Sequence, residues 1–249
     1  MNSSLILAAV VPALLLPGGA GAAEIKVLST QAPEQAYREL VPQFEKASGH
    51  TVTTIFTGTL DVQKRIAAGE TYDLIIMAGP AIDDFIKSGK IVAGSRVDIA
   101  KSGVGVAVHA GAPKPDIGTT EAVKKTLLAA KSIGYSTGPS GVYLTGLFRR
   151  LGVADQIKDK LKQTPTGVFV GNLVASGEAE IGFQQVSELA HFPGVDFVGP
   201  LPADIQETTV FSSGIQVGSQ QQDAAKAWVK FLTAPTAAPV YKAKGLEPG

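Results

Sequence analysis

Short apolar runs alternate with amphipathic helical patterns through the first third of the chain. The apolar run 25–28 predicts a buried strand, and segment 33–48 then repeats apolar residues at helical spacing until Gly49. The same order recurs twice, as strand 51–56 before helix 60–68 and strand 72–77 before helix 80–88. Three strand–helix units in succession predict a parallel sheet with helices on its faces, whose ligands bind at the carboxyl ends of the strands.

The pattern continues into a second lobe and then returns. The extended run Gly103–His109 leads out of the first lobe, and the run 208–217, which we expect to be interrupted at residues 212–214, leads back. Between them the pattern predicts helices 120–130, 155–161 and 168–176 and strands 132–135, 178–183 and 195–198. Helices 223–232 and 236–244 have amphipathic faces that need the first sheet to cover them.

The predicted fold is therefore α/β, with two lobes joined by two crossover strands. Each lobe is a mostly parallel sheet flanked by helices, and the cleft between the lobes is the expected ligand site. We assign residues 24–106 and 209–249 to lobe I and residues 107–208 to lobe II.

One strand-to-helix turn is suited to holding an anion. Strand 132–135 leads into Ser136 and Thr137, and Gly138–Gly141 form the turn before a helix that we expect to begin near Val142. The first N–H groups of a helix have no partner within it, and the helix dipole places positive charge there. Hydroxyls of Ser136 and Ser140 add donors. The alternative is that this segment is simply a capped turn.

Two turns of the first lobe carry similar neutral donors. Ser29, Thr30 and Gln31 follow the first strand, and Thr59 closes a Thr-Gly-Thr turn after the second. In the second lobe, strand 178–183 delivers Gln185 at its carboxyl end. The residues of the two turns in the first lobe have the alternative role of capping a helix.

The N-terminal segment predicts export. Its apolar run, Leu5–Leu16, is short for a stable membrane span, and Ala20-Gly21-Ala22 has the small residues that a signal peptidase requires. We expect residues 1–23 to be a cleaved signal peptide and the mature protein to be free in the periplasm. A membrane anchor or a buried strand is the alternative.

Composition narrows the classes of function. Lys plus Arg equals Asp plus Glu at 22 each, which leaves no basic surface for nucleic acid. There is no cysteine, and the three histidines lie far apart outside any metal-binding spacing, so we expect no metal and no cofactor. The turn at Ser140 lacks the nucleophile spacing of hydrolases because Val142 stands where the last glycine belongs.

Several segments together resemble a known family. FEKASG (44–49), KRIAAGETYDLIIMA (64–78), PSG (139–141), SGEAEIGF (176–183) and AWVKFLTAP (227–235) follow the order and spacing of molybdate-type periplasmic solute-binding proteins of ABC importers. The resemblance spans about Ile25 to Gly245. It implies the type II periplasmic-binding fold, a small anionic ligand, an ABC permease as partner and a monomeric protein.

The resemblance also implies positions for the ligand contacts. The first serine of the family falls on Ala32, where Thr30 or Gln31 could substitute, and its second serine falls on Thr59. The family's backbone donors fall on Ser140 and near Gly167, and its tyrosine falls on Gln185. With these side chains changed, either a molybdate-like oxyanion or a small organic acid fits. An organic acid is favoured further if Arg65 or Arg149 reaches the cleft.

Two alternatives remain open beside an anion-binding protein for transport. The sequence also resembles relatives of aconitate isomerase, which move a proton across a tricarboxylate and therefore need a base, for which Glu188, Tyr143 and His109 are the candidates. We assign no residue a catalytic role. The second alternative is a colonisation or adhesion factor that uses this fold as a surface protein.

Overall fold

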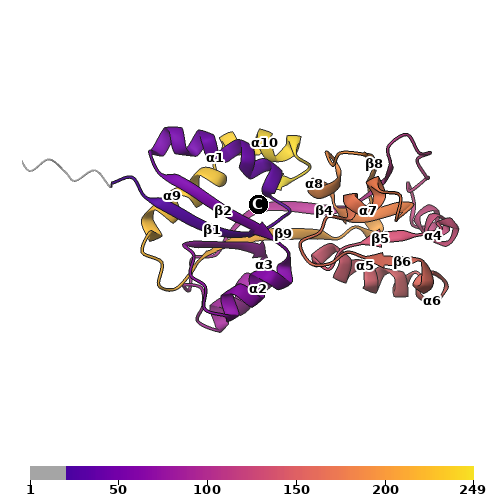
Figure 1. Cartoon of the computed structure of the whole chain (residues 1–249), viewed down its shortest axis with the longest axis horizontal. Coiled ribbons are helices and arrows are strands. Elements are labelled where there is room, and N and C mark those ends of the chain that lie inside the picture. The colour runs from indigo at the N-terminus through magenta and orange to yellow at the C-terminus, as the bar shows by residue number, and fades with distance from the viewer. Residues whose placement is uncertain (1–20) are drawn as a thin grey trace, which may run out of the picture.

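The computed structural model describes residues 21–249 and folds them into two α/β lobes joined by two long strands (Figure 1). In Figure 1 the indigo and yellow segments form lobe I, and the pink and orange segments form lobe II. The predicted signal peptide, residues 1–23, lies outside the described residues except for its last three. Within residues 21–249, no helix has both the length and the apolar character needed to cross a bilayer.

Lobe I begins with the three predicted strand–helix units. They are β1 (Glu24–Thr30), α1 (Glu34–Ser48), β2 (Thr51–Thr57), α2 (Thr59–Ala67), β3 (Leu74–Ala78) and α3 (Gly79–Lys87). Strand β1 pairs in parallel with both β2 and β3, so the predicted parallel arrangement of these units is confirmed. Helix α1 ends where predicted because Gly49 takes a left-handed φ of 75° and its N–H donates to the Glu45 carbonyl.

Lobe II repeats this plan less regularly. Its elements are α4 (Thr120–Ala129), β5 (Ile133–Tyr135), α5 (Pro139–Arg150), α6 (Ala154–Ile157), the 3₁₀ turn Lys158–Lys160, β6 (Leu161–Gln163), α7 (Val170–Ala175), β7 (Ile181–Gln185), α8 (Val186–Leu189), β8 (Val195–Pro200) and the 3₁₀ turn Ala203–Ile205. Strand β5 pairs in parallel with β6 and β7.

Three predictions for lobe II need correction. Helix α5 begins at Pro139 rather than near Val142, because proline at the first helical position loses no hydrogen bond. The predicted helix 155–161 breaks after one turn, and its end becomes part of strand β6, which pairs with β5. The predicted strand 178–183 lies at 181–185 and leads directly into α8, a helix that the pattern did not indicate.

Two antiparallel strands, β4 (Val97–His109) and β9 (Thr208–Ile215), connect the lobes. Strand β4 starts earlier than predicted and pairs with β9 up to Gly103; from Val104 it pairs with β7 and β8 of lobe II. One strand thus belongs to both lobes, and the sheet runs in the order β2-β1-β3-β9-β4-β7-β5-β6. The lobe boundaries at 106/107 and 208/209 stay a predicted division of these continuous strands.

The predicted interruption of the returning strand at residues 212–214 is wrong. Ser212, Ser213 and Gly214 pair with β3, and Ser212 and Ser213 also pair with β4, in the middle of the lobe I sheet. The small residues serve packing, since a Cβ on Gly214 would lie 2.7 Å from a methyl carbon of Ile91. Serine and glycine therefore mark close packing here rather than a turn.

The terminal helices cover lobe I as their amphipathic faces require. Helix α9 (Gln222–Leu232) and helix α10 (Ala238–Ala243), which follows the 3₁₀ turn Pro235–Ala237, pack with α1 around the buried Trp228. The short strand β10 (Glu247–Pro248) closes on β4. A second core under α2 and α3 surrounds Ile75 and Met77, and the core of lobe II surrounds Leu144, Phe148 and Phe183. Burial of each such side chain contributes about 1.5–3 kcal/mol.

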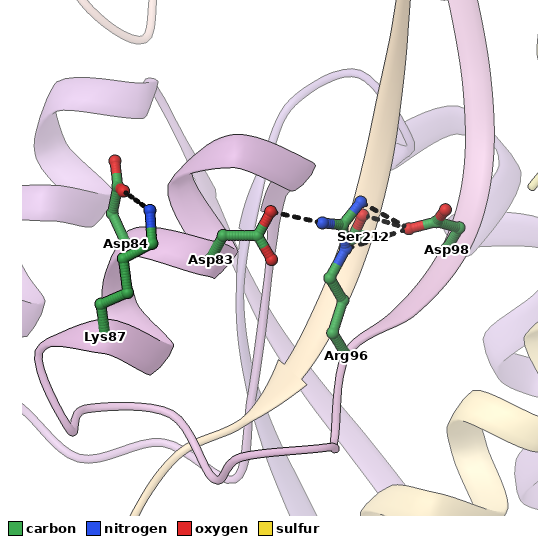
Figure 2. Close-up of polar contacts among 6 residues, drawn as sticks. All are labelled: Asp83, Asp84, Lys87, Arg96, Asp98 and Ser212. Atoms are coloured by element: carbon green, nitrogen blue, oxygen red, sulfur yellow. Dashed lines mark hydrogen bonds and ion pairs between the residues drawn. The ribbon is translucent and has the colours of Figure 1, made fainter.

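A polar cluster fixes the base of the crossover strands (Figure 2). Arg96, before β4, forms ion pairs with Asp83 on α3 and with Asp98 on β4. The Ser212 hydroxyl on β9 donates to the same Asp98 carboxylate at 2.6 Å. This hydrogen bond, with the nearby Arg96, lowers the pKa of Asp98 below its usual range. The cluster therefore joins α3, β4 and β9 at the point where the chain leaves lobe I.

We expect Ser212→Ala to lower the free energy of unfolding by about 1 kcal/mol in urea titrations at neutral pH. The value is modest because the Asp98 side chain is 44% exposed and water can replace the lost donor. Lys87→Ala is the control, since it removes an ion pair with Asp84 whose two side chains are both about three-quarters exposed. It should change stability by less than about 0.5 kcal/mol. Equal effects of the two substitutions would contradict a role for the cluster.

Candidate functional site

The strand-to-helix turns of the two lobes face each other around a small cavity. It holds about 30 Å³, against the roughly 10–15 Å³ that one water molecule needs. Lobe I contributes Thr30, Gln31, Ala32, Thr57, Gly58, Thr59 and Phe211 to its wall, and lobe II contributes Ser136–Ser140, Gly167, Val168, Gln184, Gln185 and Glu188. The cavity thus lies where the two predicted sets of turns meet.

All of the predicted ligand residues except Ser29 lie in this wall. Thr30, Gln31 and Thr59 come from lobe I, whereas Ser136, Ser140, Gly167 and Gln185 come from lobe II. Ser29 is fully buried, and its hydroxyl donates to the Thr30 carbonyl at 2.8 Å. Its side chain points away from that of Thr30 because successive residues of a strand alternate faces.

The start of α5 forms one side of the cavity. Pro139 has no N–H, and no side chain caps this helix, so the N–H groups of Ser140 and Gly141 have no acceptor within it. The hydroxyls of Ser136 and Ser140 lie 3.1 Å apart. Only glycine fits at 141, where a Cβ would lie 1.7 Å from the Ser136 carbonyl oxygen. The turn therefore brings backbone and hydroxyl donors together.

The start of α2 faces it from lobe I. Gly58 precedes this helix, again without a side-chain cap, and the N–H groups of Thr59 and Leu60 are left without intrahelical acceptors. The Thr59 hydroxyl would lie 3.9 Å from a Cβ placed on Gly138, so the two helix starts lie close across the cavity. The positive dipole ends of two helices therefore border the same cavity.

Thr30 carries the clearest sign of a missing partner. It is 5% exposed, it lines the cavity, and its hydroxyl oxygen is buried without any hydrogen bond. A buried hydroxyl without a partner costs about 1–3 kcal/mol. Thr57 differs, because its hydroxyl donates to the Asp61 carboxylate at 3.1 Å. The Thr30 hydroxyl therefore has no hydrogen-bond partner among the described residues, and its residue belongs to the cavity wall.

The lobes are in contact in this structure. The Gln31 side-chain amide of lobe I donates to the Gly167 carbonyl of lobe II at 3.0 Å. Beside it, a Cβ on Gly58 would lie 2.1 Å from the Thr166 hydroxyl and 2.4 Å from the Gly167 nitrogen. Gly58 therefore permits an approach that no other residue would allow, and the structure is that of a closed cleft.

Gln184 and Gln185 at the end of β7 are committed to structural contacts. The Gln184 side-chain oxygen accepts from the Val170 N–H at 2.7 Å. In the amide orientation that satisfies both ends, Gln185 donates to the Ser102 carbonyl at 2.9 Å and accepts from the Thr209 hydroxyl at 3.0 Å. Gln185 thus links the cavity wall to both crossover strands, although it was predicted as a ligand contact.

Glu188 is an acid in an otherwise neutral wall. Among the described residues that line the cavity, it alone is ionisable. Burial raises its pKa to about 8, despite opposing hydrogen bonds from the Gln185 backbone and the Gln184 side chain. Sequence reasoning named Glu188 only as one candidate base, because α8, which directs it into the cleft, is too short to leave a helical pattern.

The other charged or catalytic candidates lie away from the cavity. Arg65 pairs with Glu70 on the surface, and Arg149 is exposed at the far end of α5. The Tyr143 hydroxyl donates to the Ile205 carbonyl, and His109 is exposed at the end of β4. In the part of the chain that the structure describes, no group of three or more His, Asp or Glu side chains is arranged to hold a metal ion.

The wall also includes residues that we did not predict as ligand contacts. Thr57 and Gly58 belong to a turn that was recognised for its donors, so sequence signal existed for them. Phe211 and Val168 carried no such signal. Phe211 reaches the cavity because β9 is a continuous central strand rather than an interrupted one.

A family profile, two curated proteins and a solved structure each match most of the chain. The sequence profile described as bacterial extracellular solute-binding protein matches residues 25–247. The chain is 37% identical over 230 residues to an aconitate isomerase of a Pseudomonas species, covering 90% of this chain and 87% of that protein. It is 30% identical over 238 residues to a molybdate-binding protein of Azotobacter vinelandii, covering 93% and 92%. The solved periplasmic molybdate-binding protein of A. vinelandii superposes with a TM-score of 0.76 at 21% identity, covering 90% and 99%.

We expect Gly58→Ala to prevent full contact between the lobes. The added methyl group would overlap the Thr166 hydroxyl and the Gly167 nitrogen, whereas the backbone at Gly58, with φ −75° and ψ 158°, accepts alanine without strain. Small-angle X-ray scattering should therefore give a larger radius of gyration than for the unsubstituted protein, with unchanged thermal stability.

Gly146→Ala is the matched control, because its Cβ would meet nothing closer than the Arg150 side chain at 3.5 Å. It should leave the radius of gyration unchanged. Identical scattering from Gly58→Ala and the unsubstituted protein would contradict the lobe contact described above.

Proposed function

The chain belongs to the bacterial extracellular solute-binding proteins, and we propose that it captures a small anion in the cleft between its lobes for an ABC importer. The unpartnered Thr30 hydroxyl carries this proposal, because a buried donor without a partner favours a guest that accepts hydrogen bonds. The uncapped starts of α2 and α5 support the same chemistry from both sides.

The donors in the wall favour recognition by hydrogen bonds rather than by ion pairs. Neither Arg65 nor Arg149 belongs to the wall, so no cationic side chain among the described lining residues balances the charge of the guest. Hydrogen bonds from hydroxyl and N–H groups between the lobes are stronger than in bulk water, because less solvent competes with them. Ser140 and Thr59 would contact the anion from opposite lobes, and binding would thereby draw the lobes together.

The volume of the cavity favours a compact guest. About 30 Å³ suits a single tetrahedral oxyanion or one carboxylate group. A larger organic acid would require a wider cleft, with one carboxylate at the two helix starts. The family partner would be an inner-membrane permease, and we propose that the protein acts as a periplasmic monomer.

We expect calorimetry to detect binding of at least one anion from the set molybdate, tungstate, sulfate, phosphate, citrate and trans-aconitate. Thr30→Val should weaken that binding by about 1.5–3 kcal/mol, or roughly tenfold to a hundredfold, because one hydrogen bond to a charged ligand is lost. Thr59→Ala should act in the same direction.

Thr54→Val is the matched control for this experiment. It also removes a buried hydroxyl without a partner, but Thr54 lies on β2 and does not line the cavity. It should leave the affinity unchanged. Binding by the unsubstituted protein that is equally insensitive to Thr30→Val and Thr54→Val would show that the anion binds elsewhere.

A second candidate function is isomerisation of an unsaturated tricarboxylate, and the 37% identity to an aconitate isomerase favours it. This chemistry requires a base that takes a proton from a CH₂ group beside the double bond and an acid that returns a proton at the far end of the allylic system. The double bond shifts and no electrons are gained or lost overall. Glu188 could perform both steps, since its pKa of about 8 lies near neutral pH.

If the protein is such an isomerase, trans-aconitate should convert to the cis isomer in a proton NMR assay. Glu188→Gln should reduce the rate by a factor of about 100 or more, because the proton carrier is lost. Tyr143→Phe is the control outside the cavity and should keep the rate. Absence of conversion by the unsubstituted protein would exclude this candidate and leave the binding function.

A further inference from the structure

Glu188 stands between two adjoining spaces. On one side it lines the cavity between the lobes, and on the other it lines an outer pocket of about 90 Å³. Gln31 is the other residue common to both walls. The outer pocket is completed by Glu34, Gln35, Phe169, Ser187, His191, Phe192 and Pro193. Glu188 thus belongs to the walls of both spaces.

The charge state of Glu188 bears directly on anion binding. An ionised carboxylate would share with the bound anion a cavity whose other lining side chains are neutral. Two like charges in such a space oppose each other, so one of them must be neutralised. A protonated carboxyl group removes this repulsion and also supplies an O–H donor. The geometry therefore favours a proton on Glu188 whenever an anion is bound.

We propose that anion capture by this protein is proton-coupled: the cleft takes up the anion together with one proton carried by the Glu188 carboxyl group, and a rise in pH releases both. This inference rests on the anion-binding function proposed above. Glu188 would thereby select among anions. A fully ionised anion accepts a hydrogen bond from the protonated acid, whereas an anion that must donate a hydrogen bond is disfavoured.

The surroundings of Glu188 support this role. Burial, with a smaller contribution from the Glu34 carboxylate on α1, raises its pKa to about 8, so it is largely protonated in the free protein at neutral pH. Glu34 is itself paired with Arg38. The other charged groups near α8 make contacts elsewhere. Lys101 on β4 lies near Asp98, the Asp196 carboxylate on β8 accepts from the Gly111 N–H, and Lys244, which follows α10, pairs with Glu39. His191 lies in the outer pocket, where its ring nitrogen is hydrogen-bonded to the Ala243 carbonyl.

The test is calorimetry with molybdate and with trans-aconitate from about pH 7.5 to about pH 9.5, which includes the Glu188 pKa of about 8. Each titration is repeated in buffers of different ionisation enthalpy, which measures proton uptake. For the probe that binds, Kd should rise about tenfold per pH unit above about pH 8, with uptake approaching one proton per anion. Glu188→Gln keeps a neutral side chain of the same shape, and it should show a flat profile and no uptake.

His191→Gln is the control, because His191 is another titratable side chain of the outer pocket. This variant should keep the slope of Kd against pH that the unsubstituted protein shows. A pH-independent Kd for the unsubstituted protein would overturn the proton coupling and leave the anion-binding function intact. Failure of these two probes and of the other four anions named above to bind at any pH would instead overturn the binding function, and the coupling with it.

A measurement without ligand tests the acid itself. Carbon-13 NMR of glutamate carboxyl groups should show one group that titrates near pH 8 and is missing from Glu188→Gln. A Glu188 group that titrates below about pH 6 would overturn the inference, because the carboxylate would then be ionised at neutral pH.

Discussion

The uncapped starts of α2 and α5 face each other across the interlobe cavity, and the rest of the site is arranged around them. Each helix begins without a side-chain cap, so backbone N–H groups from both lobes lack acceptors where the two dipoles converge. Gly58 and Gly141 allow this convergence because a side chain at either position would collide with neighbouring atoms. The small neutral residues in these turns are therefore a requirement of close approach as well as of ligand chemistry.

The crossover strands connect this site to the rest of the molecule. Gln185 lies in the cavity wall and bonds to both β4 and β9, while Arg96, Asp98 and Ser212 join the same strands at their base in lobe I. A change in the distance between the lobes must pass through these two strands. The contacts of Gln185 link a cavity residue directly to the two connecting strands, which gives a physical route from an occupied cleft to the relative position of the lobes.

Sequence reasoning located the fold and most of the cavity wall because local rules decide them. Apolar periodicity identified the strand–helix units, and donor-rich turns identified Thr30, Thr59 and Ser140. Sequence reasoning failed for the features that depend on tertiary contacts. The Ser212–Gly214 segment reads as a break, yet it is a central strand, since its small residues allow Ile91 to pack. The contacts of Gln185 with β4 and β9 depend on long-range strand pairing, and the position of Glu188 depends on α8, which is too short to be recognised.

The most direct measurement is a crystal structure of the protein with the anion that binds it most tightly. The arrangement described here predicts that the anion lies between the lobes, with its oxygens within about 3.2 Å of the Thr59 and Ser140 N–H groups and of the Thr30 hydroxyl. Electron density for the anion on an outer surface, or in the cleft but bound by side-chain cations instead of these neutral donors, would contradict it.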